Sequence, residues 1–558
     1  MNKATLCAMH RSAARSLGPR TALRYKQDGI WRDLSWNDFR QQADRAAFGL
    51  LQLGVELGDR VAVLSENRAE WVVADQALLS AGAASVTMHA PLTPPQVAFQ
   101  VSHSQSKGII VSGYDEARKV VEVLDQLPDL EFLVSFEPLP STLQTCRPVQ
   151  TYTWQELVHL ARPHDDWQQT VLQREAQVTA DDPATVIYTS GTTGDPKGVV
   201  LTHKNLLTNA ASTGDAGNYG PSDVFLSWLP YSHIYARTVD LYVTMSTWGT
   251  LCVGGPIDDL LDDFSQTHPT WMTAVPRFYE KLWTSVEGLP LDERRTELRR
   301  LLGPRLTHLS SGGAPLPKHI AAGFLECDIP LYQGYGLTES SPVISFNNRG
   351  QNRLGSVGLP LPGVEVRIAE DGEILTRGAH VMKGYWRNDE ATREAIIDGW
   401  LYTGDIGFLD DDGYLFITDR KKDIIVTSSG KNIAPTEVER LLISDPMIDQ
   451  AVVYGDARPF LTALIVPARC LLEEEIRRRH WSIDVDGDFI TSGNIHEFFA
   501  ARIAAVMQSL SRPEQVREFL LLNRTFSHDR DELTATLKVR RRVILKTFED
   551  QLSALYGR

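Results

Sequence analysis

Cysteine is scarce in this chain, and its distribution excludes two kinds of site. Five cysteines are scattered over 558 residues, and none has C-x-x-C spacing: Cys7, Cys146, Cys252, Cys327 and Cys470. Structural zinc sites and disulfide frameworks need thiols in pairs at short, regular spacing. We therefore expect neither of them. The odd number of separate thiols favours a reducing compartment, the cytoplasm.

Long apolar runs are also missing. A membrane-spanning helix needs about 18 or more apolar residues in succession, and the sequence has no such run and no apolar core of a secretory signal near its start. No acidic residue precedes Asp28, which is typical of a transit peptide, but the strand-like TALRY at 21–25 leaves little room for a cleavable leader. We expect the basic N-terminus to form the first helix of the fold, and any membrane association to be peripheral.

Positive charge is outnumbered by negative charge. The 56 Lys and Arg residues against 71 Asp and Glu residues give a net charge of -15 and a pI of about 5.5. Nucleic-acid binding depends on an excess of positive charge, so we expect no nucleic-acid partner. Hydrophobic residues make up 42% of the chain and charged residues 23%, which is typical of a globular protein long enough for more than one domain.

Helix and strand patterns alternate through about the first 330 residues. DRVAVLSEN at 59–67 and GIIVSG at 108–113 have the composition of buried strands, and AEWVVADQALLSAGAA at 69–84 has that of a helix. This alternation predicts an α/β fold with parallel sheets flanked by helices. Short strands and Gly/Pro turns then predict a small β-rich subdomain at about 343–418, at the end of an N-terminal domain that covers 1–418.

After a charged segment at 419–422 the pattern returns to α+β. We therefore predict a boundary at 419–422 and a smaller C-terminal domain over 423–558. The sequence leaves the oligomeric state open between a monomer and a homodimer.

The stretch YTSGTTGDPKG at 188–198 concentrates glycines, hydroxyl side chains and one lysine between two apolar, strand-like runs. Backbone N–H groups and hydroxyls in such a loop can hold a polyphosphate. A flexible hairpin is the alternative. The Walker A motif needs Gly-Lys followed by Ser or Thr, and neither this motif nor G-x-G-x-x-G is present. A different kind of phosphate-binding loop is therefore the functional hypothesis.

This stretch resembles the phosphate-binding signature of the adenylate-forming acyl- and aryl-CoA synthetases. Other segments are similar to motifs of that family and follow in the same order: WLPYSHIYAR (228–237), LSSGGAPL (309–316), YQGYGLTES (332–340), YTGDIG (402–407), DRKKDIIVTSSGKNIAPTEVE (419–439) and LTATLKVRR (533–541). The resemblance spans nearly the whole chain. The last two segments are most similar to the long-chain fatty acyl branch.

The resemblance implies a reaction in two steps. A carboxylic acid, here a medium- to long-chain fatty acid, attacks the α-phosphate of ATP and gives acyl-AMP and pyrophosphate. The thiol of CoA then displaces AMP. ATP and CoA are thus implied as co-substrates and Mg²⁺ as the cofactor. The first step brings a carboxylate against a triphosphate, so cations and hydrogen-bond donors must gather where the two anions meet.

The family motifs imply roles for the nucleotide-binding residues of this sequence. Glu339 supplies the oxygen ligand that Mg²⁺ prefers, and Thr338 donates to the α-phosphate. Asp405 accepts from the ribose hydroxyls with help from Arg420. The phosphates are held by Thr189, Ser190, Gly191, Thr192, Thr193, Gly194 and Lys197, and adenine lies between Tyr335 with Gly336 and the backbone of Gly312, Gly313 and Ala314.

The resemblance also implies a moving C-terminal domain. Lys538 would be the catalytic lysine of the first step, and rotation about a hinge at Lys422 would remove it and bring Lys431 to CoA. His233 would lie beside the carboxylate or the thiol. Taken alone, His233 also fits a buried structural histidine, and Lys431 an exposed lysine without function. Arg237 stands where some relatives carry a tryptophan gate, so no gate of that residue type is expected.

Three alternatives remain at this point. A ligase of the same family could load an acyl carrier protein or stop at acyl-AMP, although the uninterrupted segment at 335–358 lacks the insertion typical of stand-alone acyl-AMP ligases. A phosphotransferase could use the loop as an ATP site, and would release ADP. A catalytically inactive binding protein is disfavoured, because Glu339, Asp405, Arg420 and Lys538 are all present.

Overall fold

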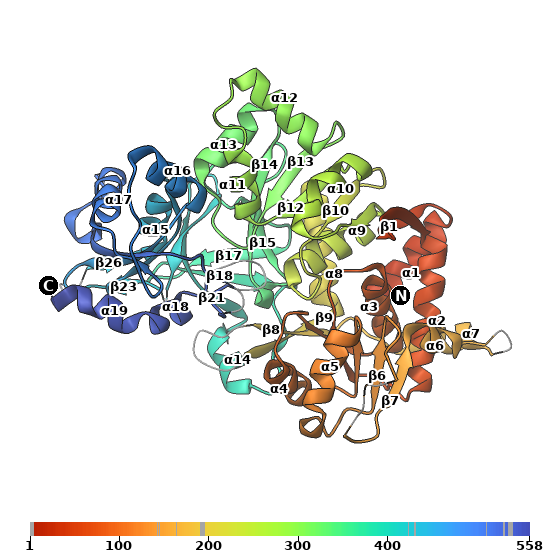
Figure 1. Cartoon of the computed structure of the whole chain (residues 1–558). Coiled ribbons are helices and arrows are strands. Elements are labelled where there is room, and N and C mark those ends of the chain that lie inside the picture. Colours follow the sequence, from red (N-terminus) through yellow and green to blue (C-terminus); the bar gives the residue numbers. More distant parts are fainter. Residues whose placement is uncertain are drawn as a thin grey trace. The chain divides into compact units, whose positions relative to one another are not determined.

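The structure is a computed structural model (Figure 1), and it describes residues 5–557 apart from 142, 144–145, 163–164, 190–195, 422, 429–430, 509, 528–529 and 534–538. The chain divides into two compact units. The first comprises Met1–Arg367, Leu375–Thr403 and Asp410–Leu415, and the second comprises Ile368–Ile374, Gly404–Leu409 and Phe416–Arg558. The hinge at 419–422 stays a prediction, and its Lys422 lies outside the described residues.

The first unit contains a nine-stranded sheet. Its central strands β14, β13, β12, β10, β11 and β1 are parallel, and antiparallel strands lie at both edges. The order across the sheet is β16 (Leu359–Pro360), β15 (Val343–Phe346), β14 (Leu331–Gly336), β13 (His308–Ser311), β12 (Trp271–Ala274), β10 (Val224–Ser227), β11 (Thr250–Val253), β1 (Thr21–Gln27) and β2 (Ile30–Ser35).

The first unit also contains an eight-stranded sheet, in which the six strands from β8 to β7 are parallel and β9 and β19 are antiparallel additions. The order is β19 (Gly384–Tyr385), β9 (Lys197–Thr202), β8 (Pro183–Thr189), β4 (Ala84–Met88), β3 (Arg60–Leu64), β5 (Gly108–Val111), β6 (Phe132–Ser135) and β7 (Gln150–Thr153). Apart from the edge strand β7, the parallel strands are almost entirely buried and rich in Val, Ile and Leu, because helices cover both faces of such sheets.

Helices connect the parallel strands and pack on the two sheets. Helix α8 contacts β9 of one sheet and β15 of the other, so it lies between them. It begins with a capping box in which Thr202 and Asn205 satisfy each other's backbone N–H groups. The longer helices of this unit are α1 (Leu6–Leu17), α2 (Trp36–Gln52), α3 (Ala69–Ala81), α4 (Pro94–Ser104), α5 (Tyr114–Glu122), α7 (Trp167–Glu175), α8 (His203–Gly217), α10 (Leu260–Thr267), α11 (Pro276–Thr284), α12 (Leu291–Leu302) and α13 (Lys318–Glu326).

Shorter helical segments complete this unit. They are η1 (Leu124–Gln126), α6 (Trp154–His159), the π-helix η2 (Ala236–Tyr242), α9 (Val243–Thr247), η3 (Ile257–Asp259), η4 (Thr338–Ser340) and α14 (Asp389–Ala395). A π-helix is rare and frequently lies at a functional site. The segment that carries His233 leads directly into η2, so His233 and the π-helix are adjacent candidates for a functional site.

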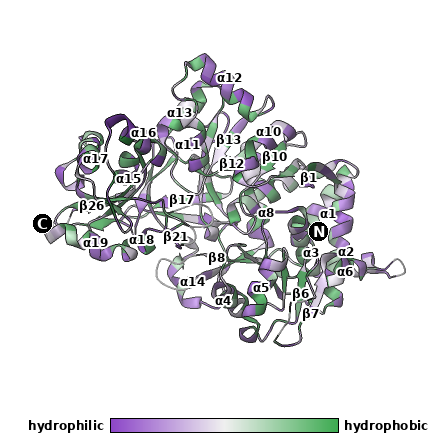
Figure 2. Ribbon diagram, in the orientation of Figure 1, coloured by the Kyte–Doolittle hydropathy of each residue, from purple (hydrophilic) through white to green (hydrophobic). Residues whose placement is uncertain are grey.

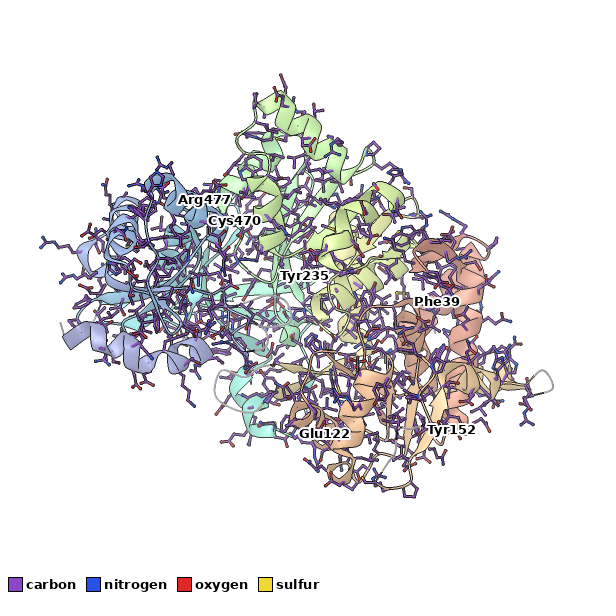
Figure 3. The ribbon with its side chains drawn as sticks, viewed as in Figure 1. Phe39, Glu122, Tyr152, Tyr235, Cys470 and Arg477 are labelled. Atoms are coloured by element: carbon purple, nitrogen blue, oxygen red, sulfur yellow. The ribbon has the colours of Figure 1, made fainter. Side chains whose placement is uncertain are left out.

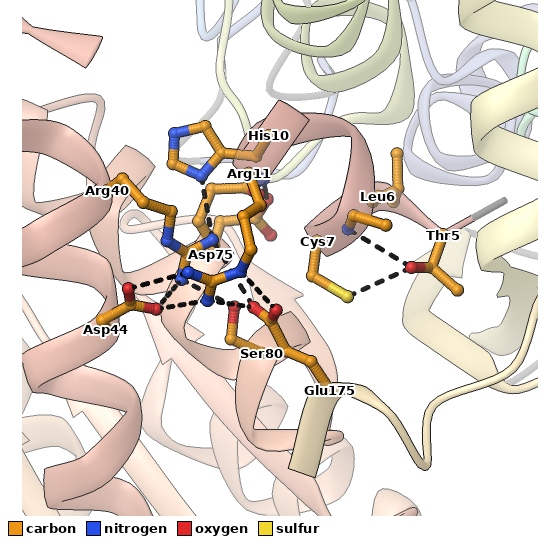
Figure 4. Close-up of polar contacts among 12 residues, drawn as sticks. Thr5, Leu6, Cys7, His10, Arg11, Arg40, Asp44, Asp75, Ser80 and Glu175 are labelled. Atoms are coloured by element: carbon orange, nitrogen blue, oxygen red, sulfur yellow. Dashed lines mark hydrogen bonds and ion pairs between the residues drawn. The ribbon is translucent and has the colours of Figure 1, made fainter. Parts of the chain in front are cut away.

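The basic N-terminal segment forms helix α1, as expected, and polar contacts hold it to α2 and α7 (Figure 4). Arg11 pairs with Asp44 at 2.7 Å and with Glu175 at 2.7 Å. Arg40 of α2 also pairs with Asp44 at 2.6 Å and donates to the ring of His10. Burial, together with the positive charges of Arg40 and Arg11, lowers the pKa of His10. The first helix is therefore an integral part of the core.

A third sheet of short strands runs in the order β17 (Val364–Ile368), β18 (Glu373–Gly378), β21 (Trp400–Leu409) and β20 (Ile396–Ile397), with β22 (Leu415–Arg420) beside β21. The second unit adds β23 (Ile425–Val426) and β24 (Asn432–Ile433), and a five-stranded sheet of β25 (Ile448–Tyr454), β26 (Leu461–Pro467), β29 (Val516–Leu522), β28 (Phe489–Ile490) and β27 (Val485–Asp486). Its helical segments are α15 (Pro435–Ile443), α16 (Arg469–Arg479), α17 (Gly493–Val506), η5 (Arg512–Glu514), α18 (Arg541–Thr547), α19 (Glu549–Ala554) and η6 (Leu555–Gly557).

Hydropathy follows this architecture (Figure 2). Helix α16, with its many Arg and Glu side chains, is strongly hydrophilic, whereas the apolar side chains gather in the cores of the units. In the part of the chain that the structure describes, no helix is both long enough and apolar enough to cross a bilayer.

Candidate active site

Three of the predicted motifs lie at one edge of the nine-stranded sheet. Strands β10, β13 and β14 run parallel to β12, so their carboxyl ends meet at the same edge. His233 follows β10, Gly312 follows β13, and Glu339 follows β14. Ligands of open α/β sheets bind outside the carboxyl ends of the strands. The fold thus brings these three motifs, far apart in sequence, to the edge where such sheets bind ligands.

The His233 segment is fixed against the carboxyl ends of two strands of the eight-stranded sheet. Asn67, which follows β3, donates to the carbonyl of Leu229 at 2.7 Å and accepts from the amide of Tyr231 at 2.8 Å. Thr87 of β4 donates to the carbonyl of Ser232 at 3.1 Å. The segment therefore joins the carboxyl edges of both sheets. Sequence reasoning missed Asn67, because a single Asn after a strand is also an ordinary turn residue.

Tyr235 lies beside the predicted adenine segment. The Tyr235 side chain is labelled in Figure 3. A Cβ atom at Gly312 would be 2.8 Å from Cζ of Tyr235, so a side chain at that position would displace the ring. The next residue, Gly313, has φ of +81°, a conformation that favours glycine. Ala314 completes the turn after β13. Burial raises the pKa of Tyr235, so its hydroxyl stays protonated.

The end of β14 turns sharply into the short helix η4. A Cβ atom at Gly336 would lie 1.8 Å from the carbonyl oxygen of Pro342, which requires glycine at this position. The turn places Thr338, which is buried, and Glu339 in η4, and the carbonyl of Glu339 accepts from the amide of Met382 at 2.8 Å. Tyr335 lies in β14, opposite Ser345 of β15.

The predicted phosphate loop connects two paired strands of the eight-stranded sheet. Thr189 ends β8, and Lys197 begins β9 directly opposite it in the antiparallel ladder. Ser190, Gly191, Thr192, Thr193 and Gly194 lie outside the described residues. The two ends of the loop are therefore held together by the sheet.

Tyr385 links this loop to the predicted metal ligand. The Nζ atom of Lys197 lies 5.0 Å from the centre of the Tyr385 ring, and the Tyr385 hydroxyl donates to Oε1 of Glu339 at 2.9 Å. Strand β19, which carries Tyr385, pairs with β9 and so brings the three side chains together. Burial and the Glu339 carboxylate raise the pKa of Tyr385, which keeps the hydroxyl a donor. Sequence reasoning missed Tyr385, which belongs to none of the recognised motifs.

A buried carboxyl group lies on the π-helix next to the site. Asp240 accepts from the hydroxyl of Ser227 at 2.6 Å and from that of Thr273. Burial raises the pKa of Asp240 to about 7, and these two hydrogen bonds reduce the shift. Its neighbour Arg237 is fully buried as well.

In the second unit, the two residues predicted to bind ribose lie together. Nε of Arg420 is 2.9 Å from Oδ1 of Asp405, and Asp405 is buried. Gly404 precedes Asp405 with φ of +72°, and its amide donates to Glu373 at 2.9 Å. The turn fixes the direction of the Asp405 side chain. Such a pair can bind two adjacent hydroxyl groups, because the Asp405 carboxylate accepts hydrogen bonds and the Arg420 guanidinium donates them.

The remaining predicted residues lie in the C-terminal part of the chain. Lys431 donates to Ser511 at 2.6 Å and pairs with Glu514 at 3.3 Å, so it is engaged within its own unit. Lys422 and Lys538 lie outside the described residues.

The donor set at η4 fits the implied Mg²⁺. Among the described residues there is no cluster of three or more His, Cys, Asp or Glu side chains that could hold a metal by itself. Mg²⁺ in nucleotide sites is usually bound by one or two carboxylates together with phosphate oxygens and water. A single carboxylate at Glu339, with the Thr338 hydroxyl beside it, suits a metal that arrives with the nucleotide.

Comparison with known proteins agrees with this geometry. Residues 9–386 match the AMP-binding enzyme family, and residues 422–558 match the AMP-binding enzyme C-terminal domain. The chain belongs to the AMP-binding enzyme family. The resemblance inferred from the motifs is thereby confirmed.

Relatives of this AMP-binding enzyme include named ligases. A long-chain-fatty-acid–CoA ligase of Mycobacterium bovis, FadD15, is 34% identical over 95% of this chain and 93% of its own length. The long-chain-fatty-acid–CoA ligase ACSBG2 of Xenopus laevis is 29% identical over 99% of this chain and 84% of its own length.

Solved structures share the fold of this AMP-binding enzyme. The anthranilate CoA ligase AuaEII, in complex with anthranoyl-AMP, has a TM-score of 0.81 at 20% identity and covers 99% of each chain. O-succinylbenzoate CoA synthetase from Bacillus subtilis, in complex with ATP and magnesium, has a TM-score of 0.73 at 25% identity, over 96% of this chain and 98% of its own. The predicted α/β fold is confirmed.

Proposed function

We propose that this AMP-binding enzyme activates a medium- to long-chain fatty acid with ATP, forming acyl-AMP and pyrophosphate, and then transfers the acyl group to CoA with release of AMP. The arrangement of Lys197 and Glu339 on either side of Tyr385 carries the proposal. A cation and a carboxylate thus lie close together beside the end of the phosphate loop at Lys197, which supports the proposal. That is where a triphosphate needs both kinds of group.

In the first step, the loop at 189–197 holds the β- and γ-phosphates through backbone N–H groups and hydroxyls. Thr338 donates its hydroxyl to the α-phosphate, and Glu339 is the carboxylate that would hold the metal ion. When it is bound with ATP at Glu339, Mg²⁺ supplies charge neutralisation at the phosphates. Lys538 adds a second cation where the carboxylate meets the α-phosphate, and so stabilises the transition state more than the ground state.

His233 orients the acid. Its Nδ1 accepts from the amide of Tyr235 at 3.2 Å, so the proton of the neutral ring lies on Nε2. From Nε2 the ring donates to the carboxylate in the first step and lies beside the thiol in the second. Asp405 and Arg420 bind the ribose, and the hinge at Lys422 lets the C-terminal domain exchange Lys538 for the CoA-binding surface.

The relatives support the fatty acid and CoA as substrates. Both are named as long-chain-fatty-acid–CoA ligases, and one shares 34% identity over 95% of this chain. We propose the cytoplasm as the compartment and a free carboxylic acid as the first substrate. The acceptor is proposed to be CoA instead of a carrier protein.

A panel of carboxylic acids tests this proposal. Pyrophosphate release is measured for fatty acids of increasing length and for aryl acids, each with and without CoA. We expect the highest turnover with medium- to long-chain fatty acids and CoA, and only a single turnover without CoA. Highest turnover with aryl acids would overturn the substrate class, and full turnover with an acyl carrier protein alone would overturn the acceptor.

A further inference from the structure

Arg237 is fully buried, and hydrogen bonds engage all three of its guanidinium nitrogens. Nε donates to the Tyr242 hydroxyl at 2.9 Å, and Nη1 donates to the Thr185 hydroxyl at 2.6 Å. Nη2 donates to the Ser85 hydroxyl at 2.6 Å and to the carboxylate of Asp75. Burial alone would lower the pKa of Arg237, but Asp75 and Tyr242 oppose this and the pKa is raised. The side chain is therefore a cation at every physiological pH.

The partners of Arg237 come from separate elements. Asp75 lies on α3, Ser85 on β4 and Thr185 on β8, all in the layer of the eight-stranded sheet. Arg237 itself lies on η2, which follows β10 of the nine-stranded sheet. The planar guanidinium has donors in fixed directions, so one side chain sets the spacing of several elements at once. The contact therefore bridges the two sheets.

The two ends of this bridge lead to the two substrates. Thr185 lies four residues before Thr189, on the strand that leads into the phosphate loop. Arg237 lies four residues after His233, on the helix that follows the acid-binding segment. Asn67 and Thr87 fix the other end of that segment. The segment with His233 and Tyr235 is thus held on both sides.

We propose that Arg237 is a positioning residue that sets the distance between strand β8, at Thr185, and the His233 segment, through the π-helix and the buried Asp75. This inference rests on the proposed function. Tyr235 packs on Gly312, so a shift of η2 would displace both the acid-binding and the adenine segments. The hydrogen-bonded contact of Arg237 with Asp75, Ser85 and Thr185 is thus a fixed connection between the two sheets, which we call the brace. A gating motion would break its hydrogen bonds and leave the Asp75 charge buried without its partner, which is strongly unfavourable.

Two variants test the brace. Arg237→Met combined with Asp75→Asn removes both charges and so leaves no unpaired buried ion. Arg237→Lys keeps the charge but not the fork-shaped set of donors. The matched control is Arg300→Met on α12, where an exposed arginine pairs with Glu297. Each full-length variant is assayed for ATP binding, for single-turnover acyl-AMP formation and for hydrogen exchange in the amides of residues 229–243.

We expect both Arg237 variants to bind ATP more weakly and, at saturating ATP, to form acyl-AMP about 100-fold more slowly, because small misplacements of reacting groups have effects of this size. We also expect faster amide exchange within 229–243. The control should match the wild type. A lower melting temperature with wild-type rate and wild-type exchange would show a merely structural role and overturn the proposal, as would full activity of Arg237→Lys. If the double variant does not fold, Arg237→Lys decides alone. If the wild type itself forms no acyl-AMP, the proposed function fails, while the exchange measurement still tests the brace.

Discussion

The hydroxyl of Tyr385 donates a hydrogen bond of 2.9 Å to Oε1 of Glu339, and Tyr385 reaches this position because β19 pairs with β9. The carboxylate is thus oriented by a side chain from a different part of the sequence. Metal ligands are commonly held in this way, and loss of the partner that orients them typically costs about 10–100-fold in metal affinity or activity. The geometry therefore gives Tyr385 a role that none of the family motifs suggests.

Tyr385→Phe removes the hydroxyl and keeps the ring beneath Lys197. We expect the Mg²⁺ concentration for half-maximal adenylation to rise by about 10–100-fold, as for other groups that orient a metal ligand. Mg²⁺ titrations of pyrophosphate release measure this. Tyr152→Phe on β7, whose hydroxyl contacts Gln150 at the far edge of the same sheet, is the control. An unchanged Mg²⁺ requirement in Tyr385→Phe would remove Tyr385 from the account.

Glu339→Gln keeps the shape of the side chain and removes its charge. The amide is a poor ligand for Mg²⁺, so turnover with Mg²⁺-ATP should fall sharply while the circular dichroism spectrum and melting temperature stay close to those of the wild type. Normal activity with the wild-type Mg²⁺ dependence would show that another group binds the metal.

Asp240 makes stability depend on pH. Its pKa is raised to about 7 in the folded chain from the ordinary value of 3.8, so between these values only the unfolded chain has lost the proton. The free energy of unfolding therefore falls as pH rises through this window, by about 4 kcal/mol at most. Asp240→Asn has no carboxyl group at this position, so its free energy of unfolding does not fall for this reason. Its stability relative to the wild type should increase from pH 4 to pH 7, as measured by denaturant unfolding.

The control for Asp240 is Asp262→Asn, which replaces an exposed aspartate on α10 and is compared with the wild type over the same pH range. Comparison of each variant with the wild type cancels the contribution of other titrating groups, including the buried histidines. A difference between Asp240→Asn and the wild type that does not change with pH would contradict the shifted pKa.

Lys538→Ala should separate the two half-reactions. Removing one preorganised donor typically slows a step by about 10²–10³-fold, so acyl-AMP formation should slow by that factor. Acyl transfer from supplied acyl-AMP to CoA should remain near the wild-type rate, because the proposed rotation of the C-terminal domain removes the lysine before this step. Lys422→Pro, which fixes φ at the hinge, should show the reverse pattern. Two single-turnover assays per variant measure this, and equal damage to both steps in Lys538→Ala would refute its assignment.

Much of the fold follows from the sequence. The strand TALRY is found as the start of β1, and the alternation at 59–113 is found as β3, α3, β4, α4 and β5. These elements are predictable because their strands are short apolar runs buried on both faces, and their helices have clear limits such as Gly82 after α3. The antiparallel edges of both sheets are less evident, since β15, β16 and β19 are short and their pairing depends on distant segments.

The site was predictable only where a motif is local. Glu339 and Lys197 stand in recognisable stretches, but Tyr385 becomes relevant only through sheet pairing. Arg237 is similar, because its basic side chain in the sequence gives no sign that Asp75, far away in the chain, would neutralise it. Contacts between sheets depend on tertiary packing, which no pattern of neighbouring residues encodes.

The nucleotide products test the central claim most directly. The full-length protein is incubated with ATP, Mg²⁺, CoA and a long-chain fatty acid, and the nucleotides are separated by anion-exchange chromatography. Acid activation through an adenylate predicts AMP and pyrophosphate in equal amounts, with one acyl-CoA formed for each AMP. ADP and inorganic phosphate as the only nucleotide products would contradict it, because they would mean that the γ-phosphate, and not AMP, is transferred.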